Sequence, residues 1–215
     1  MCLKLYVPGS FARTARFAAI RGMHPMINTD MGKSEERHQY FANHFLISLS
    51  RLAGDYFHST VTLILQHNAE GAFGLVINRP LDAELDSLIE NMPAKITSPV
   101  LEGGPVEQTR LFFLHSDEKS YSGSLDTGIG VILSSSDDLI SDLKKQLIPE
   151  HLLPVIGYAG WGPGQLENEL IEDAWLITPA TREIIFETAP SNMAEKAAAL
   201  FGIDLNLYHS TTSQS

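Results

Sequence analysis

The order of the short apolar runs in this chain constrains its fold more than any other feature. A β-branched run at residues 60–65 and a second apolar run at residues 73–77 are separated by a short polar segment. That segment holds Asn68 and Gly71, which tolerate the positive φ angles that a tight turn requires. The two runs therefore predict a β-hairpin, which ends at Pro80 because proline lacks the N–H that a strand ladder needs.

The remaining apolar runs mix hairpin spacing with β–helix–β passages. A doubly wound parallel sheet would alternate strands and helices more strictly, so we expect a mixed or mainly antiparallel sheet with helices packed on it. The predicted helices, which follow apolar residues at helical spacing, are residues 82–91, 136–147, 164–172 and 191–202. The other predicted strands are residues 45–49, 100–102, 111–115, 130–133, 154–158, 175–178 and 183–186.

Two of the predicted helices carry local expectations that a structure can check. Ser136 stands where its side-chain oxygen would accept a backbone N–H at the start of a helix, and Leu147 falls on the apolar side of that helix. Ser191 is the predicted cap of the last helix. Leu200 and Phe201 are predicted to face inward from it.

Composition indicates one folded domain between two appendages. The chain has 215 residues, of which 44% are apolar, and this is enough to bury one substantial core. We expect an N-terminal extension without stable structure at residues 1–37, a single domain at residues 38–209 and a polar tail at residues 210–215. Cys2 is the one cysteine, so no disulfide can form within the chain. No apolar run approaches the roughly 18 residues that span a bilayer.

Charge is distributed unevenly between these parts. Residues 1–37 hold six basic and three acidic residues, a net charge of +3, whereas residues 38–215 hold nine basic and 23 acidic residues, a net charge of −14. A body this acidic repels phosphate backbones, and no helix-turn-helix with a basic recognition helix is visible. Direct DNA binding is therefore disfavoured, and only the first segment has positive charge to spare.

Four motifs, in this order and spacing, carry a resemblance to a known family. Together they extend over about residues 41–208, and the third, which is long, is the most specific. They are His67-Asn68-x-x-Gly71-x-x-Gly74-x-x-x-Asn78-Arg79-Pro80, then Gly103-Gly104-Pro105-Val106, then Gly157-Tyr-Ala-Gly-Trp-Gly-Pro-Gly-Gln-Leu-Glu167, and finally Ala174-Trp175-Leu176. With these motifs the chain resembles the YqgE/AlgH family of bacterial proteins.

The resemblance implies an α+β fold whose sheet curls into a partial barrel, and a cytoplasmic location. Some members are labelled transcriptional regulators, yet the family has no agreed biochemical activity. The chain departs from the family pattern at Gln66, where an acidic residue is expected, and at residues 55–57, which lack an expected proline. The first departure weakens any role that needs a carboxylate directly beside His67.

The glycine-rich segment before the predicted helix 164–172 is the first candidate ligand site. Free backbone N–H groups at a helix start bind anions, and Trp161 could stack on a ring that Tyr158 and Gln165 help to orient. The structural alternative is a tight turn that needs a positive φ angle at Gly164, with Trp161 packed in the core. The segment has neither the P-loop nor the dinucleotide-binding spacing.

The second candidate site comprises His67, Asn68, Asn78 and Arg79. The histidine could transfer a proton, and the arginine could hold a carboxylate by two contacts. The structural alternative assigns the asparagines to the ends of the hairpin and the arginine to a nearby acid. Glu102, beside Gly103, Gly104 and Pro105, is either a proton carrier or a solvated or ion-paired residue at the end of a strand.

The sequence predicts neither a metal site nor a cofactor. His115 ends a strand without a second histidine or cysteine at ligand spacing, and Ser48, Ser50 and Ser59 lack the setting of a catalytic nucleophile. The sequence leaves open whether the protein is an enzyme, and it favours a protein without catalytic activity.

Three classes of function remain, and the oligomeric state stays open. The first, which we favour, is a non-catalytic binding or regulatory module with a small-molecule or protein partner. The second is an enzyme that uses His67 or Glu102 as its proton carrier, and the third is a direct DNA-binding regulator.

Overall fold

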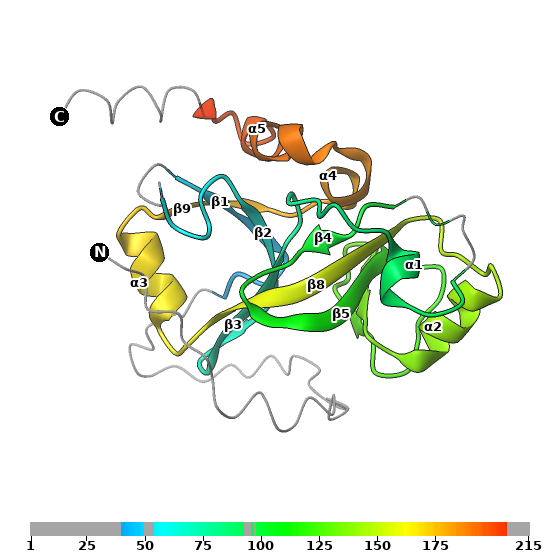
Figure 1. Ribbon diagram of the computed structural model, residues 1–215. Coiled ribbons are helices and arrows are strands. Elements are labelled where there is room, and N and C mark those ends of the chain that lie inside the picture. Colours follow the sequence, from blue (N-terminus) through cyan, green and yellow to red (C-terminus); the bar gives the residue numbers. More distant parts are fainter. Residues whose placement is uncertain (1–39, 50–53, 93–95, 97, 206–215) are drawn as a thin grey trace, which may run out of the picture.

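The structure is a computed structural model that describes residues 40–49, 54–92, 96 and 98–205. Nine strands form one sheet in the order β6-β7-β5-β8-β3-β2-β1-β9, and β4 pairs with β8 beside this path. Helices flank the sheet (Figure 1). The expectations for residues 1–37, for residues 210–215 and for Ser50 lie outside the described residues.

The predicted hairpin is present as β2 (Val61–Asn68) and β3 (Gly71–Val76), which pair antiparallel from Thr62 opposite Val76 to Asn68 opposite Gly71. The turn between them contains an Asx turn, because the Asn68 side-chain oxygen accepts the Glu70 N–H at 2.8 Å. β1 (His44–Ser48) pairs with β2, and β9 (Trp175–Pro179) pairs with β1, so the hairpin extends into a four-stranded antiparallel unit.

The other half of the sheet is built around β5 (Val106–Ser116), which pairs antiparallel with β7 (Val131–Ser134) on one side and with β8 (Leu152–Trp161) on the other. β6 (Leu125–Asp126) adds a short outer strand, and β4 (Leu101–Glu102) pairs with β8 in parallel. This confirms the mixed, mainly antiparallel sheet.

Strand β8 joins the two halves of the sheet. Its first residues pair with β5 and β4, and its last residues, 159–161, pair with β3. The path of strands is open, since it runs from β6 to β9 and no pairing between these two is present among the described residues. The partial barrel stays a prediction.

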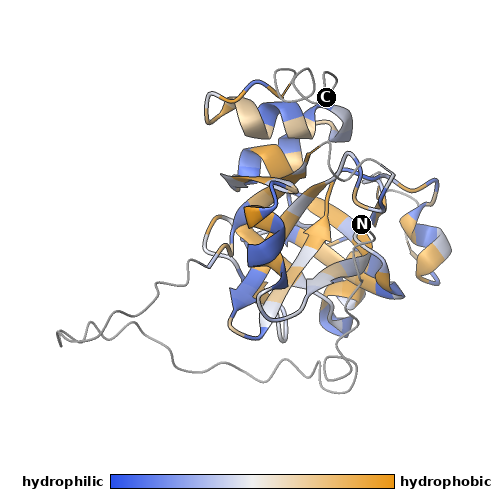
Figure 2. Ribbon diagram, turned by 90° about the vertical axis from the view of Figure 1, so that its left-hand side faces the viewer, coloured by the Kyte–Doolittle hydropathy of each residue, from blue (hydrophilic) through white to orange (hydrophobic). Residues whose placement is uncertain are grey.

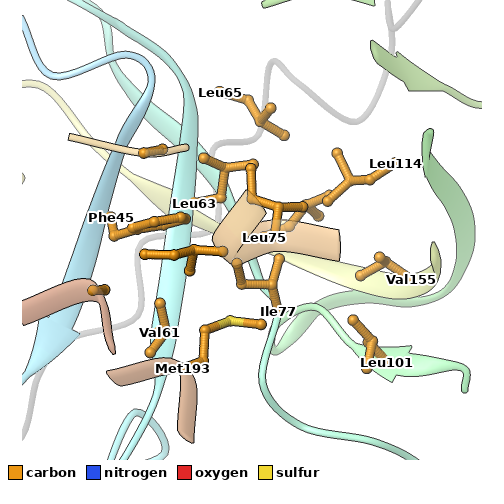
Figure 3. Packing of buried hydrophobic residues seen from close by; sticks show 14 of the residues in the cluster. Phe45, Val61, Leu63, Leu65, Leu75, Ile77, Leu101, Leu114, Val155 and Met193 are labelled. Atoms are coloured by element: carbon orange, nitrogen blue, oxygen red, sulfur yellow. The ribbon is translucent and has the colours of Figure 1, made fainter. Parts of the chain in front are cut away.

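The largest core cluster lies where both halves of the sheet meet helices α4 (Arg182–Glu187) and α5 (Met193–Ala199). Phe45, Leu63 and Leu75 come from the hairpin unit, Leu114 and Val155 come from the other half, and all five are fully buried (Figure 3). Figure 2 shows apolar residues concentrated on the central strands, whereas the helices around them carry hydrophilic and apolar residues together.

Residues 183–186, predicted as a strand, are helical instead. α4 (Arg182–Glu187) begins after Thr181, whose hydroxyl accepts the Ile184 N–H at 3.3 Å. A short apolar run is compatible with either a strand or a buried helix. Here the Thr181 cap favours the helix, because it satisfies a backbone N–H at the helix start. The consecutive isoleucines 184 and 185 are both buried in the helix.

α4 and α5 (Met193–Ala199) lie together along the side of the sheet that carries β1 and β9 (Figure 1). A 3-10 turn, residues 190–192, precedes α5, so Ser191 lies in this turn and Asn192 is the residue before the helix. Met193 and Ala197 are buried as expected, but Leu200 and Phe201 are 58% and 46% exposed because the helix ends before them.

Two predicted helices on the other side of the molecule are shorter than expected. α1 (Leu85–Leu88) is a single turn, and α2 (Asp137–Lys144) stops before Leu147, which is 57% exposed instead of buried. Ser136 precedes α2 as predicted, but its side chain makes no capping hydrogen bond. α3 (Gln165–Ile171) matches the predicted helix. None of the helices in the described ranges is long and apolar enough to cross a membrane.

Candidate functional site

The glycine-rich segment is partly a strand, because β8 continues to Trp161 and the turn is confined to residues 162–164. Trp161 is 3% exposed. Its indole Nε1–H donates to Glu169 Oε2 at 2.8 Å, and the Nε1–H of Trp175 donates to the same oxygen at 2.8 Å. Both tryptophans of the chain therefore point at one carboxylate on α3.

The second oxygen of this carboxylate is also bound. Gln165 Nε2 donates to Glu169 Oε1 at 2.9 Å, while Gln165 Oε1 accepts the Gly162 N–H of the turn at 3.1 Å. We call Trp161, Trp175, Glu169 and Gln165 the indole–carboxylate cluster. Phe57 closes it from outside, with its ring centroid 6.1 Å from that of Trp161 and 5.6 Å from that of Trp175.

Every polar atom of the indole–carboxylate cluster thus faces another part of the same chain. Indole N–H groups only donate, and a carboxylate with three N–H donors accepts at both oxygens. Gly164, with φ of 71°, begins α3 in the left-handed conformation that the turn requires. Tyr158, another predicted ligand residue, is 8% exposed and packs its ring 5.1 Å from that of Phe73. Burial raises the pKa of the Tyr158 hydroxyl.

His67 lies at the far end of β2, with a side chain that has no exposed area. Its Nδ1 accepts the Phe41 N–H at 3.0 Å, and its Nε2 lies 3.0 Å from Glu167 Oε1. Because a backbone N–H can only donate, Nε2 carries the hydrogen that Glu167 accepts, so neutral His67 satisfies both contacts. The carboxylate that the sequence lacks at Gln66 comes instead from α3.

Asn78 and Arg79 lie at the opposite end of the hairpin and bind backbone groups. Asn78 accepts the Val61 N–H at 2.8 Å and donates to the Ser59 carbonyl at 3.0 Å. Arg79 Nη2 donates to the carbonyls of Tyr56 and His58 at 2.5 and 2.9 Å. These two side chains hold the 56–60 loop against the sheet, and that loop carries Phe57 into the indole–carboxylate cluster.

Glu102 accepts the Tyr56 hydroxyl at 2.8 Å, and the Arg79 guanidinium lies 4.9 Å from the centre of the Tyr56 ring. Burial, with a further contribution from Glu102, raises the pKa of the Tyr56 hydroxyl. The Glu102 N–H donates to the Arg79 carbonyl, beyond the end of the hairpin at which Thr62 pairs with Val76, whereas His67 lies five residues further along β2. At about 3.3 Å per residue the two groups are on the order of 16 Å apart, which is too far for a direct contact.

Gly103 and Gly104 allow the backbone to approach β8 closely. A Cβ atom at Gly104, where φ is +154°, would lie 2.1 Å from the carbonyl carbon of Tyr158, and one at Gly103 would lie 2.4 Å from the Gly157 oxygen. The Gly103 N–H donates to the Ile156 carbonyl, and Pro105, which follows, is partly exposed. Glycine is thus required at both positions, because any Cβ atom there would overlap the backbone of β8.

The structure therefore places most of the predicted site residues at two separate ends of the hairpin. Trp161, Gln165 and Gly164 lie around α3. His67 and Asn68 lie close by, at the turn end of the hairpin. There Gly71 pairs with Asn68, and a Cβ atom on Gly71 would meet the Trp161 carbonyl oxygen. Asn78 and Arg79 lie at the other end with Glu102. Across the described ranges, no group of three histidine, cysteine, aspartate or glutamate side chains is placed to hold a metal ion.

A second polar cluster lies at the other end of β8, and sequence reasoning missed it. His115 is fully buried, and its Nδ1 lies 2.8 Å from the Ser116 carbonyl while its Nε2 lies 2.8 Å from Ser134 Oγ. Ser134 Oγ lies 2.5 Å from Ser124 Oγ. We call Ser124, Ser134 and His115 the serine–histidine row. No motif marks it, because its members are separated in sequence and only the strand register aligns them.

A surface hollow of about 390 Å³ lies beside this row and between the 116–121 segment and the end of α2. Tyr121 forms part of its wall and packs edge-on against His115, with ring centroids 5.4 Å apart. Lys119 pairs with Asp142 and lies 4.9 Å above the Tyr121 ring, and the pairing raises the pKa of the Lys119 ammonium. Residues 147–150 complete the hollow, together with Glu118.

The sequence of this chain is similar to that of known bacterial proteins. The profile of the AlgH-like family matches residues 45–206. A UPF0301 protein of Nitrosococcus oceani is 42% identical over 173 residues, which cover 78% of this chain and 92% of the relative. A UPF0301 protein of Thioalkalivibrio sulfidiphilus is 40% identical over 172 residues, with the same coverage of 78% and 92%.

Two solved structures share the fold. The solution structure of the AlgH protein from Pseudomonas aeruginosa is 38% identical, with a TM-score of 0.69 over 86% of this chain and 98% of that chain. A crystal structure of a Corynebacterium diphtheriae protein has a TM-score of 0.66 at 17% identity, over 81% of this chain and 94% of that chain. The latter likeness concerns the fold alone.

Proposed function

The chain belongs to the AlgH-like family, and from its geometry we propose that it is a non-catalytic binding module whose partner is another protein. The single observation that carries this proposal is an exposed apolar pair, Leu147 and Ile148, set in an acidic hollow. Leu147 is 57% exposed and Ile148 is 40% exposed. We further propose that the protein acts in the bacterial cytoplasm.

The contacts of the predicted ligand residues support a protein partner over a small molecule. Trp161 and Gln165 are bound within the indole–carboxylate cluster, and Arg79 is bound to two backbone carbonyls. A small ligand that used these groups would have to replace hydrogen bonds that already exist within the protein. Such an exchange of one hydrogen bond for another contributes little net free energy to binding. Small-molecule binding remains the alternative within this class.

The hollow has the chemistry of a docking site for a positively charged segment. Its apolar wall consists of Tyr121, Leu147, Ile148 and Pro149, and the carboxylates of Glu118, Asp142 and Glu150 lie around it. Among the described residues that line the hollow, Lys119 is the one basic side chain, and Asp142 already pairs with it. Exposed apolar groups with a charged rim mark protein interaction sites, and complementary charge accelerates association. The partner we propose is a basic segment with an apolar anchor.

The net charge of −14 on residues 38–215 favours a positively charged partner and disfavours direct DNA binding. A regulatory role of the kind that some family names suggest would then act through a protein partner. Measurable binding of a DNA duplex at physiological salt would contradict this part of the proposal.

The test is selection of peptides from a random display library against the full-length protein. We expect enrichment of peptides that carry Lys or Arg on both sides of an apolar residue, with affinity that falls as salt is raised. Leu147→Asp should reduce the affinity of the selected peptides at least about tenfold, because it places a charge on the apolar wall.

Leu88→Asp is the matched control, since Leu88 is also exposed, at 41%, but lies on α1 outside the lining of the hollow. It should leave peptide binding unchanged. Enrichment of acidic peptides, or equal loss of affinity in both variants, would exclude the hollow as the docking site.

A further inference from the structure

The serine–histidine row takes no part in the proposed function and has a chemistry of its own. His115 comes from β5 and Ser134 from β7, on neighbouring antiparallel strands in which Phe113 pairs with Ser134 and His115 pairs with Ile132. Ser124 immediately precedes β6, whose Leu125 pairs with Leu133 of β7. The strand register therefore places one side chain from each of three neighbouring segments in a line across the sheet.

Hydrogen-bond chemistry fixes the direction of this line. The Ser116 carbonyl can only accept, so His115 Nδ1 carries the hydrogen and Nε2 of the neutral ring is the acceptor. Ser134 then donates its hydroxyl hydrogen to Nε2, and its oxygen is available to accept from Ser124. The Tyr121 N–H donates to Ser124 Oγ at 3.1 Å, which leaves the Ser124 hydroxyl hydrogen directed at Ser134.

The row therefore connects a hydroxyl near the surface to a buried base. Ser124 is partly exposed, whereas Ser134 and His115 have no exposed area. Burial lowers the pKa of His115, against smaller opposing effects of the Ser116 carbonyl and Glu118, so the ring is neutral at pH 7 and its Nε2 lone pair accepts the Ser134 hydroxyl hydrogen. A serine hydroxyl is a weak nucleophile until a base takes its proton, and a histidine held by a third group is the common base.

Ser124 neighbours the hollow through Tyr121, although it is not itself one of the residues that line the hollow. Tyr121 lines the hollow with its ring, and its backbone N–H binds Ser124 Oγ. We propose that Ser124 is a nucleophile, activated through Ser134 by His115, that accepts the acyl group of small carboxylic esters with good leaving groups. This is a single acylation of the protein without turnover, so it is compatible with a non-catalytic module.

The reaction is balanced by the groups of the row alone. Ser124 Oγ forms a bond to the acyl carbon, and the ester bond to the leaving oxygen breaks. The Ser124 proton passes to Ser134 Oγ as the Ser134 proton passes to His115 Nε2. The products are acyl-Ser124, a positively charged His115 that still donates Nδ1–H to the Ser116 carbonyl, and the leaving group as an anion.

The experiment treats the full-length protein with p-nitrophenyl acetate at pH 7.5 and maps acetylated positions by mass spectrometry over time. Ser122 and Ser87 are internal controls, because both are exposed serines outside the row. We expect Ser124 to be acetylated at least about tenfold faster than either control, in keeping with the effect of a positioned base. Equal rates at the three serines, or no acetyl group on Ser124, would overturn the proposal.

Ser134→Ala separates activation from exposure, because it breaks the row while leaving Ser124 in place. With folding confirmed by circular dichroism, acetylation of Ser124 should slow at least about tenfold and that of Ser122 and Ser87 should not change. An unchanged Ser124 rate in this variant would show that the hydroxyl reacts without the relay. The comparison among serines in the wild-type protein decides the proposal even if the variant does not fold.

Discussion

The two polar clusters at opposite ends of β8 differ in where their hydrogen bonds end. At the Trp161 end, the indole–carboxylate cluster places two indoles and an amide on the oxygens of Glu169. At the Leu152 end, which pairs with His115, the serine–histidine row leads from a buried ring to the partly exposed Ser124. About nine residues of strand, roughly 30 Å, separate them, and Figure 1 shows α3 and α2 at the two sides of the molecule.

This difference indicates which cluster holds the fold together and which has a reactive end. A closed network of donors and acceptors stabilises one arrangement of the segments that supply it, here the 56–60 loop, α3 and β9. A row that ends at the surface can pass a proton to or from a bound molecule. The sequence motif that attracted a functional interpretation lies at the closed end, while the open end carries no motif.

The largest expected effect comes from Glu169→Gln at the closed end. One amide oxygen cannot replace two carboxylate oxygens, so either the indoles or Gln165 would face an N–H₂ group. We expect the free energy of unfolding to fall by about 4 kcal/mol. Urea denaturation followed by circular dichroism measures it, and the fluorescence of the two tryptophans reports the same cluster.

Glu70→Gln is the control for this change, because Glu70 is exposed at the hairpin turn and only its backbone N–H takes part in the Asx turn. Its effect should stay within about 0.5 kcal/mol. If Glu169→Gln were equally mild, the cluster would not be the structural centre of this end of β8, and the contrast between the two ends would fail.

Gly71→Ala tests the close approach of the hairpin to the same end of β8. A Cβ atom there would lie 2.1 Å from the Trp161 carbonyl oxygen, and the φ angle is +128°. We expect a loss of about 3 kcal/mol in the free energy of unfolding, because backbone cannot move aside as a flexible side chain would. Gly128→Ala, with φ of +76° and open space around its Cβ, isolates the cost of the φ angle alone, about 1 kcal/mol.

Thermal and urea unfolding of both glycine variants measure this difference. Equal losses in the two would mean that only the backbone conformation matters at Gly71, and that the contact with Trp161 relaxes without cost.

The smallest effect is the pH dependence that His115 contributes at the open end. Its folded-state pKa lies below the usual value of 6.5, so between these two values the unfolded chain binds more protons than the folded protein. The stability that neutral His115 contributes is fully present above pH 6.5. It is lost as the pH falls toward the folded-state pKa, and the free energy of unfolding then falls by up to about 1.4 kcal/mol per pH unit.

The unfolding free energies of wild-type protein and His115→Gln, compared between pH 7.5 and pH 5, isolate this contribution because glutamine does not titrate. The difference between the two proteins should shrink as the pH falls. An NMR titration of the His115 ring in the wild-type protein is the independent check, and a ring that charges at pH 6.5 would contradict the prediction.

Local chemistry predicted much of the fold. The hairpin with Asn68 and Gly71 at its turn, the strand at residues 175–178 and the helix after Gly164 follow from alternation, turn residues and helical spacing. The run at residues 183–186 was misassigned because two consecutive buried isoleucines fit either a strand or a helix. Leu147, Leu200 and Phe201 were placed inward because the helical pattern continued beyond the point at which the helices end.

The candidate sites were less predictable, because side-chain partners far apart in sequence decide them. In the sequence Glu169 is one of several acidic residues after the glycine-rich turn, yet in the structure it accepts the N–H groups of both indoles. His67 has a carboxylate partner 100 residues away, on α3, where the neighbouring Gln66 suggested none.

The sequence by itself determined the kind of strands and turns, the acidic charge of the body and the family to which the chain belongs, since these depend on residue types at short spacing. Only the tertiary structure decided which polar groups meet. The register of β5, β6 and β7 aligns Ser124, Ser134 and His115, and a shift of one residue would turn these side chains to the opposite face of the sheet. Register depends on long-range pairing, so a local pattern does not reveal it.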